Sequence, residues 1–263
     1  MAPVKSRAVV LRRHRLGETS CVVVCYTRDY GKVRLVAKGV RKGGGRFGAA
    51  LDPFVVSGVV FYLRPGRDLS LVSQAETERE FRSIRGDVLR QAYAAVALEL
   101  VERLVAGEAP DPALFDAVCR TLAGIDAVPE QDLKTILWSF ELGLAERLGY
   151  APELDRCASC GRAAGDESGF SIESGGVVCP RCARTVPAYG PDVPDYGPDV
   201  VDALRTLRAG APGDLRDVSE RLGDEIGRAL LGLMERHSGR SLRLRSQAVL
   251  ESLERTGRSR PAP

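Results

Sequence analysis

Short runs in which hydrophobic and polar residues alternate dominate the first eighty residues of the chain. These runs cover residues 9–12, 21–26, 32–38, 54–63 and 69–72. Alternation with a period of two is typical of β-strands that bury one face, and turns rich in glycine and proline separate the runs. Closely spaced short strands of this kind predict a small barrel or sandwich.

From about residue 81 the hydrophobic residues recur every three to four positions, which is the spacing of amphipathic helices. The pattern predicts helices over residues 86–106, 111–122, 129–148, 199–208 and 217–237. Asp111 followed by Pro112 is a typical helix start, and Gly149 is a typical helix end. We interpret the apolar stripes as the core of a helical bundle rather than as a cofactor site.

Two Cys-x2-Cys pairs interrupt the helical region. Cys157 and Cys160 form the first pair, Cys179 and Cys182 form the second, and 18 residues lie between the pairs. This spacing is typical of a four-cysteine zinc site, in which each short knuckle supplies two thiolates to a tetrahedral ion. A redox dithiol would need only one pair beside a thioredoxin-like pattern, and a catalytic zinc would keep an open position. We therefore predict one structural Zn²⁺ as the cofactor.

The other cysteines, Cys21, Cys25 and Cys119, lie in predicted strands or helices, where we expect small buried hydrophobic side chains. Gly161 suits a knuckle that needs a positive φ, and Pro180 stiffens the second knuckle. The first residues lack the apolar segment and cleavage site of a signal peptide, and the cysteine count of seven is odd. We expect reduced thiols in a cytoplasmic protein.

The expected fold class is α+β with several domains: an N-terminal barrel of the oligonucleotide-binding type (OB-fold), then an α-helical domain that carries the four-cysteine zinc module. The segment Tyr-Gly-Pro-Asp-Val, which begins at residue 189 and again at residue 196, suggests a duplicated linker. The expected boundaries are an OB-fold nucleic-acid-binding domain at 1–80, a first helical part at 81–154, the zinc module at 155–185, a linker or surface loop at 186–198, a second helical part at 199–245, and a basic, partly disordered tail at 246–263.

Charge is distributed unevenly along the chain. The net charge is only +3, but residues 1–50 hold twelve Lys and Arg against two acidic residues, so this segment carries +10 and the remainder −7. Such asymmetry suggests a polyanionic partner, most commonly nucleic acid. A basic surface that is merely solvated remains the alternative. No stretch approaches the roughly 18 apolar residues that a membrane span needs.

The basic segment coincides with a predicted strand. Alternation over residues 32–38 directs Val33, Leu35 and Ala37 to the core and the cations to the opposite face. A glycine-rich loop with three more cations follows. Cations along a strand and a loop match phosphates along a nucleic acid, without reading the bases. The predicted DNA-binding residues are Lys32, Arg34, Lys38, Arg41, Lys42 and Arg46.

Two aromatic residues, Tyr30 and Phe47, flank these cations and could stack on bases. We favour packing roles for both, because aromatic residues make up only 6% of the chain. Catalytic motifs are missing: Gly43–Gly45 lacks a P-loop ending, and neither His14 nor His237 stands in a triad pattern. We expect that the protein is not an enzyme.

Several segments together resemble the RecO family of bacterial recombinational repair proteins. They are RAVVLR at 7–12, LGETS at 16–20, GKVRLVAKGVR at 31–41, RFGAALDPF at 46–54, and LGL…LGYAP at 142–152 with the cysteine pair directly after it. The resemblance covers about residues 4–237. The triple glycine after Lys42 and the duplicated Tyr-Gly-Pro-Asp-Val depart from the family pattern, which leaves the DNA path over the loop open.

The resemblance implies an OB-fold followed by a helical domain with a zinc module. It also implies binding of single- and double-stranded DNA and annealing of complementary strands. With RecR, family members help replace single-stranded DNA-binding protein by RecA, and they contact the acidic C-terminal tail of that binding protein. This would make the protein nucleoid-associated. Two alternatives stay open: an RNA-binding or translation-associated protein, and a protein–protein adaptor for acidic tails.

Overall fold

The computed structural model describes residues 3–40, 47–63, 68–107, 109–183 and 196–258. The chain divides into two compact units. Unit 1 comprises Met1–Val128 and Leu244–Pro263, and unit 2 comprises Pro129–Arg243. In this division the helices up to Val128 group with the strands in unit 1.

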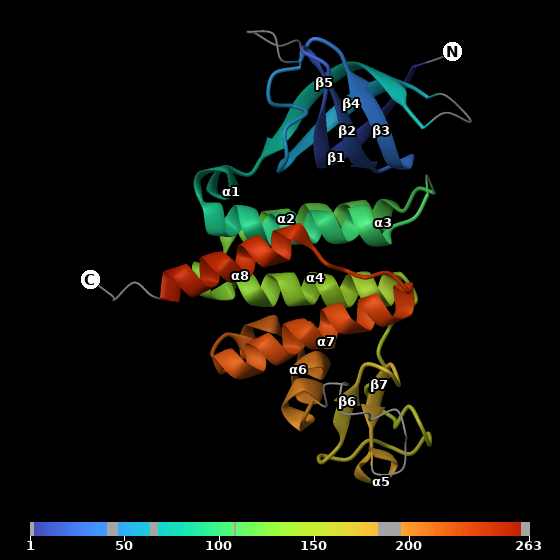
Figure 1. Ribbon diagram of the computed structural model, residues 1–263, viewed down its shortest axis with the longest axis vertical. Coiled ribbons are helices and arrows are strands. Elements are labelled where there is room, and N and C mark those ends of the chain that lie inside the picture. Colours follow the sequence, from blue (N-terminus) through green and yellow to red (C-terminus); the bar gives the residue numbers. More distant parts are fainter. Residues whose placement is uncertain (1–2, 41–46, 64–67, 108, 184–195, 259–263) are drawn as a thin grey trace. The chain divides into compact units, whose positions relative to one another are not determined.

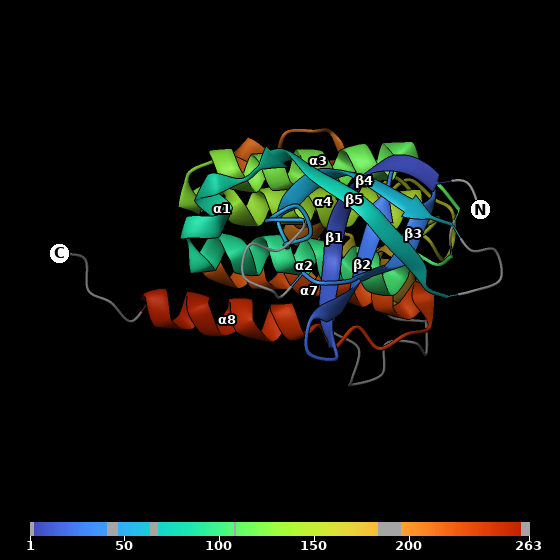
Figure 2. The ribbon, with the colours of Figure 1, turned by 90° about the horizontal axis from the view of Figure 1, so that it is seen from above.

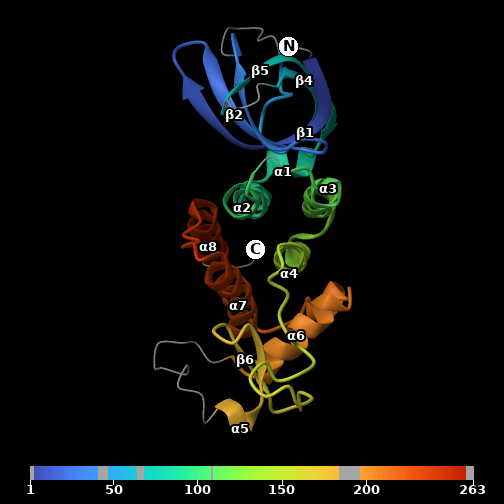
Figure 3. The same ribbon diagram turned by 90° about the vertical axis from the view of Figure 1, so that its right-hand side faces the viewer.

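Five strands of the described chain form a closed barrel in unit 1 (Figures 1 and 3). They are β1 (Pro3–Leu16), β2 (Ser20–Thr27), β3 (Gly31–Ala37), β4 (Val55–Tyr62) and β5 (Ser70–Glu80). Around the barrel the order is β1-β2-β3-β5-β4, with β4 pairing back to β1. The pair β3–β5 is parallel, and the other neighbours are antiparallel. The strand-rich N-terminal region was predicted from alternation alone.

Side chains of alternating residues fill the barrel. Val33, Leu35 and Ala37 of β3 are buried as predicted. Phe47 is also buried in this core, and the Tyr30 ring packs edge-on against Phe61 with centroids 5.6 Å apart. The packing roles that we favoured for the two aromatic residues are thus confirmed.

A β-bulge changes the direction of side chains in β1. Val10 pairs with Cys25 of β2, but the register shifts before Arg12, which pairs with Val24. In a regular strand Arg12 would share the inward face of Val10. The extra residue at the bulge, Leu11, turns Arg12 to the outer face instead, as bulges re-aim side chains.

The helices of unit 1 are α1 (Arg82–Gly86), α2 (Val88–Leu104), α3 (Pro112–Ala127) and α8 (Arg245–Arg258). Figure 3 shows α2 and α3 side by side in end view. Asp111 caps α3 as predicted, because its carboxylate accepts a hydrogen bond from Leu114 N at 2.9 Å. Val88 begins the stripe expected for α2, but it is 62% exposed, since it lies in the first turn. No helix of the described residues is long and apolar enough to cross a bilayer.

Helix α8 occupies much of the tail that we expected to be partly disordered, and it packs beside α2 (Figure 2). The Glu99 carboxylate of α2 holds its first turn. It accepts hydrogen bonds from Arg245 N at 3.2 Å, Ser246 N at 2.9 Å and Ser246 Oγ at 2.7 Å. Burial acts to raise the pKa of Glu99, but these bonds outweigh it and lower the pKa. Residues 259–263 lie outside the described residues.

Unit 2 contains the longer helices α4 (Leu133–Arg147), α6 (Pro198–Arg208) and α7 (Glu220–Ser238), together with a hairpin of β6 (Gly169–Ser171) and β7 (Gly176–Val178). The short elements η1 (Glu130–Asp132), α5 (Pro180–Ala183) and η2 (Pro212–Leu215) complete it. Gly149 ends α4 with a φ of +82°, as its sequence position suggested. The first Tyr-Gly-Pro-Asp-Val copy lies outside the described residues, whereas Tyr196 of the second copy is buried and pairs with Phe170.

Helix α4 buries both a tryptophan and an acidic side chain. The Trp138 ring packs against α7, where a Cβ added at Gly223 would lie 3.3 Å from it. Glu141 is 2% exposed, and its Oε2 atom has no hydrogen-bond partner among the described residues. Burial raises the pKa of Glu141 to about 8, so the side chain is largely protonated at neutral pH.

Candidate functional site

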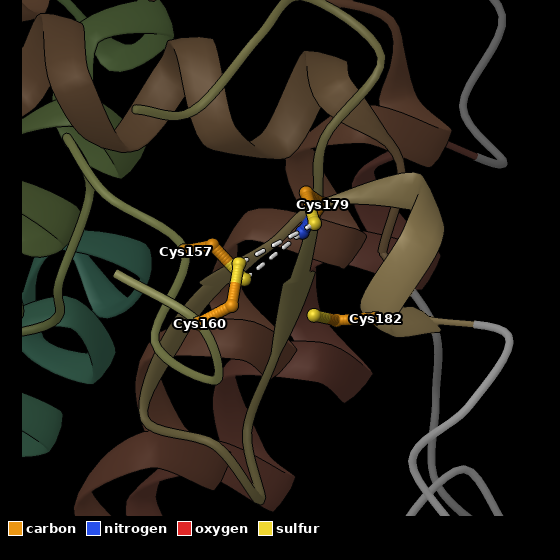
Figure 4. Close-up of side chains that lie close together, drawn as sticks. All are labelled: Cys157, Cys160, Cys179 and Cys182. Atoms are coloured by element: carbon orange, nitrogen blue, oxygen red, sulfur yellow. Dashed lines mark hydrogen bonds between the residues drawn. The ribbon is translucent and has the colours of Figure 1, made fainter. Parts of the chain in front are cut away.

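The four cysteines of the two pairs converge in unit 2 (Figure 4). Their Sγ atoms all lie within 4.8 Å of one another, and Cys160 Sγ is 3.9 Å from Cys179 Sγ. A tetrahedral ion with metal–sulfur bonds near 2.3 Å separates its sulfur ligands by about 3.8 Å. The cluster of Cys157, Cys160, Cys179 and Cys182, called the quartet below, therefore fits a tetrahedral metal ion.

Local backbone geometry explains why the pairs meet. Cys157 N donates to Arg162 O at 2.7 Å, which closes the first knuckle, and Gly161 within it has the positive φ of +70° that we expected. Cys179 follows β7 directly, and Pro180 begins α5, so Cys182 returns toward the first pair. A Cβ on Gly176 of β7 would lie 2.4 Å from the carbonyl oxygen of Glu153, so only glycine allows this approach.

The quartet favours thiolates at some positions and opposes them at others. Burial acts to raise the pKa of Cys157, but N–H groups of Cys179, Cys160 and Ser159 donate to its sulfur and lower the pKa to about 6. The pKa of Cys182 is raised to about 12, chiefly by its hydrogen bond with Cys160. Four thiolates this close repel one another, and a metal cation is what offsets that repulsion.

The other cysteines lie apart from the quartet. Cys21 and Cys25 are buried in the barrel core, as predicted, and burial raises the pKa of Cys25 to about 12. Cys119 in α3 is only half-buried, which differs from our expectation, although burial still raises its pKa to about 11. Cys25 and Cys119 therefore stay protonated at neutral pH.

The predicted DNA-binding residues have different environments in the structure. Arg34 and Lys38 are exposed on and just after β3. Lys32 instead donates from Nζ to the carbonyl oxygen of Glu102 at 2.7 Å and to that of Val105, at the C-terminal end of α2. It therefore helps to attach α2 to the barrel. The remaining three, Arg41, Lys42 and Arg46, lie outside the described residues.

Several other cations of the first fifty residues are paired with acids of unit 1. Arg7 contacts Glu78 at 2.8 Å, Arg12 contacts Glu102 at 3.3 Å, and Arg28 lies 3.8 Å from Asp116. Arg13 pairs with Asp52. Among the N-terminal cations that the structure describes, those without a pairing partner are Lys5, Arg15, Arg34 and Lys38.

Positive charge gathers on the outer face of β1, β2 and β3. Arg12 pairs in register with Val24, and Val24 with Arg34, so these residues form one row across three strands. Sequence reasoning missed Arg12 and His14, because the bulge that turns them outward leaves no sequence signal. We call the row with His14 and the exposed cations Arg34 and Lys38 the cationic face.

The opposite side of the barrel differs in charge. Outward-facing residues of β5 include Gln74, Glu76 and Glu78, and a register shift at Glu78 then places Arg79 on the outer row; all four are exposed. Glu78 is paired with Arg7, whereas Glu76 has no ion-pair partner among the described residues. The acids of β5 thus lie among the cations Lys5, Arg7 and Arg79, whereas Arg34 and Lys38 on the other side of the barrel have no such acids on their own strand.

Comparison with known proteins identifies the family. Residues 1–81 match the family model described as Recombination protein O N terminal, and residues 85–246 match Recombination protein O C terminal. The DNA repair protein RecO of Anaeromyxobacter dehalogenans (strain 2CP-C) is 36% identical over 248 residues, which cover 93% of this chain and 95% of that protein. The DNA repair protein RecO of Rubrobacter xylanophilus is 39% identical, with coverage of 80% and 82%, and that of Symbiobacterium thermophilum is 33% identical, with coverage of 96% and 98%. The chain belongs to the RecO family.

Proposed function

We propose that the chain is a non-enzymatic mediator that binds single- and double-stranded DNA and anneals complementary strands. Membership in the RecO family gives it a role in DNA repair and recombination. The observation that carries the proposal is the closed barrel with cations gathered on the outer face of β1–β3. We infer that this barrel is of the OB type, which binds oligonucleotides on that side.

Annealing by such a face needs no bond chemistry. Two strands repel each other through their phosphates, and cations that neutralise several phosphates lower this barrier. Arg34 and Lys38 supply charge without base-specific contacts, so the bases remain free to search for their register. Binding should therefore be indifferent to sequence and steeply dependent on salt.

The quartet has a structural role in this proposal. Cys157, Cys160, Cys179 and Cys182 would hold one Zn²⁺, which matches four thiolate donors at these sulfur separations. When bound, zinc cross-links the two knuckles. Four thiolates leave no coordination position for a substrate, so we assign it no catalytic step.

The proposed partners follow from the family. They are RecR, the acidic C-terminal tail of single-stranded DNA-binding protein and, indirectly, RecA. A protein that exchanges these factors at DNA gaps would act on the nucleoid in the cytoplasm. The uneven charge of the barrel supports a polyanionic partner but does not separate DNA from RNA or from acidic tails.

The deciding experiment is annealing of complementary oligonucleotides already coated with single-stranded DNA-binding protein, without ATP. We expect the chain to accelerate annealing and the effect to weaken as salt rises. Parallel titrations of labelled DNA, RNA and an acidic peptide test the alternatives. Preference for RNA, or binding of the peptide alone, would overturn the proposal.

A further inference from the structure

A pocket of about 330 Å³ opens on the cationic face beside the C-terminal end of α2. The cations Arg12, Lys32 and Arg34 line it, together with His14, Val24 and Gly107. Two acids also line it, Glu102 of α2 and the exposed Asp68. This volume lies at the lower end of the roughly 300–1,000 Å³ typical of ligand pockets. It suits one small ligand rather than a folded partner.

The lining combines charge with an apolar floor. Val24 is 5% exposed and lies between Arg12 and Arg34 in the register of the three strands. The bulge in β1 places His14 on the same outer face, two residues from Arg12. Guanidinium groups bind phosphate. The planar guanidinium group and the imidazole ring also stack on bases. The pocket thus offers both kinds of contact that one nucleotide unit makes.

An acid of the protein already occupies part of this pocket. The Glu102 carboxylate lies 3.3 Å from Arg12 Nη1, with the Arg12 side chain 48% exposed and that of Glu102 20% exposed. The end of α2 is fastened to the barrel, because the Glu102 carbonyl accepts from Lys32 Nζ. Glu102 is therefore held at the pocket by its own backbone, and a carboxylate presents oxygens to arginine much as a phosphate does.

We propose that this pocket receives one nucleotide of a bound strand, and that its phosphate displaces Glu102 from Arg12. The inference rests on the proposed DNA binding and assigns Glu102 as an internal competitor. A solvent-exposed ion pair with Arg12 is weak enough to exchange readily. Competition of this kind keeps the strand loosely held, which annealing requires.

The test compares Glu102→Gln with Glu78→Gln in the full chain. Each variant removes the negative charge of an acid that pairs with one arginine of β1: Glu102 pairs with Arg12, and Glu78 pairs with Arg7. Only Glu102 lines the pocket. With a labelled single-stranded oligonucleotide at about 0.1 M salt, we expect Glu102→Gln to bind roughly three- to fivefold more tightly than the control. The gain should disappear when Arg12→Ala is added, because the arginine is then absent.

A second pair of variants tests the same inference if the Glu102→Gln variant does not fold. Arg34→Ala should weaken binding several-fold, whereas Lys5→Ala, another exposed cation without a partner among the described residues, should not. Equal affinities within either pair would overturn the inference. If the unaltered chain binds no oligonucleotide at low salt, the proposed function itself fails, so the two failures are distinguishable.

Discussion

The quartet and the cationic face illustrate two ways of building a site. All ligands of the quartet come from one short stretch of unit 2, in two knuckles whose spacing is visible in the sequence. The cationic face collects residues from three strands and depends on a bulge, a register and the position of α2. Spacing alone describes the first site, whereas the second exists only in the folded unit 1.

The net charge of a segment therefore differs from the charge that it presents on the surface of the folded protein. The first fifty residues carry +10, yet Arg7, Arg12 and Arg28 contact acids, and Lys32 contacts helix carbonyls. Much of that charge therefore attaches the barrel to helices and balances its own acids. The cysteines of the quartet instead converge on one another, with sulfur separations that fit one metal ion.

The largest effect should come from breaking the quartet. Changing Cys157 and Cys160 to Ser should abolish binding of one zinc per chain and destabilise unit 2 by more than about 4 kcal/mol. Trp138, the only tryptophan in the sequence, lies in α4, so its fluorescence follows unfolding of unit 2. DNA binding by the barrel should persist. Cys119→Ser is the control, and a metal-free chain of full stability would contradict the prediction.

Glu141, the buried acid of unit 2, should make the free energy of unfolding depend on pH in the opposite direction to the metal-binding thiolates. The pKa of Glu141 is raised to about 8 in the folded chain from an ordinary value of 4.5. Because the folded chain holds this proton more tightly than the unfolded chain, the free energy of unfolding is highest below pH 4.5 and falls as pH rises toward 8. Between pH 4.5 and pH 7 the decrease is roughly 3 kcal/mol.

Glu141→Gln should remove this dependence in urea unfolding followed by Trp138 fluorescence. Glu146→Gln, an exposed acid on the same helix, is the matched control and should leave it unchanged. Thiolate protonation destabilises a metal site as pH falls, so the two effects have opposite signs. An identical pH profile for Glu141→Gln and the unaltered chain would contradict the buried, protonated carboxyl.

For the predicted DNA-binding cations, we expect a smaller effect, on the free energy of DNA binding. Changing Lys32, Arg34, Lys38, Arg41 and Lys42 together to Ala should weaken DNA binding roughly 10- to 100-fold and flatten its salt dependence. The matched variant removes exposed arginines of unit 2, namely Arg147, Arg162, Arg181, Arg221 and Arg240. An equal loss in this variant, measured by anisotropy over a salt series, would show that total charge rather than the face matters.

The smallest expected effect is a difference in stability between variants of two β3 residues, Lys32 and Arg34. Lys32→Ala removes a charged donor from the carbonyls of Glu102 and Val105 and should cost about 1 kcal/mol of stability. Arg34→Ala should change stability by less than about 0.5 kcal/mol, because the side chain is exposed and unpaired among the described residues. Thermal unfolding and anisotropy on both variants check this. Equal melting temperatures would mean that Lys32 does not support the end of α2.

The sequence by itself determined the strand-rich beginning, the buried face of β3, the capped start of α3 and the cysteines of the quartet. Each rests on local periodicity or on short spacing, which depends on few residues. The family resemblance likewise followed from short segments in a set order, and the comparisons confirm it.

Only the tertiary structure decided which cations remain available. A bulge leaves no sequence signal. The ion pair of Arg12 with Glu102 joins residues 90 positions apart, and the hydrogen bond from Ser246 N in the first turn of α8 to Glu99 joins residues 147 positions apart. Long-range contacts of this kind depend on how whole elements pack, so no local window contains them. The chemistry of the quartet was therefore predictable, whereas the path of a strand over the barrel was not.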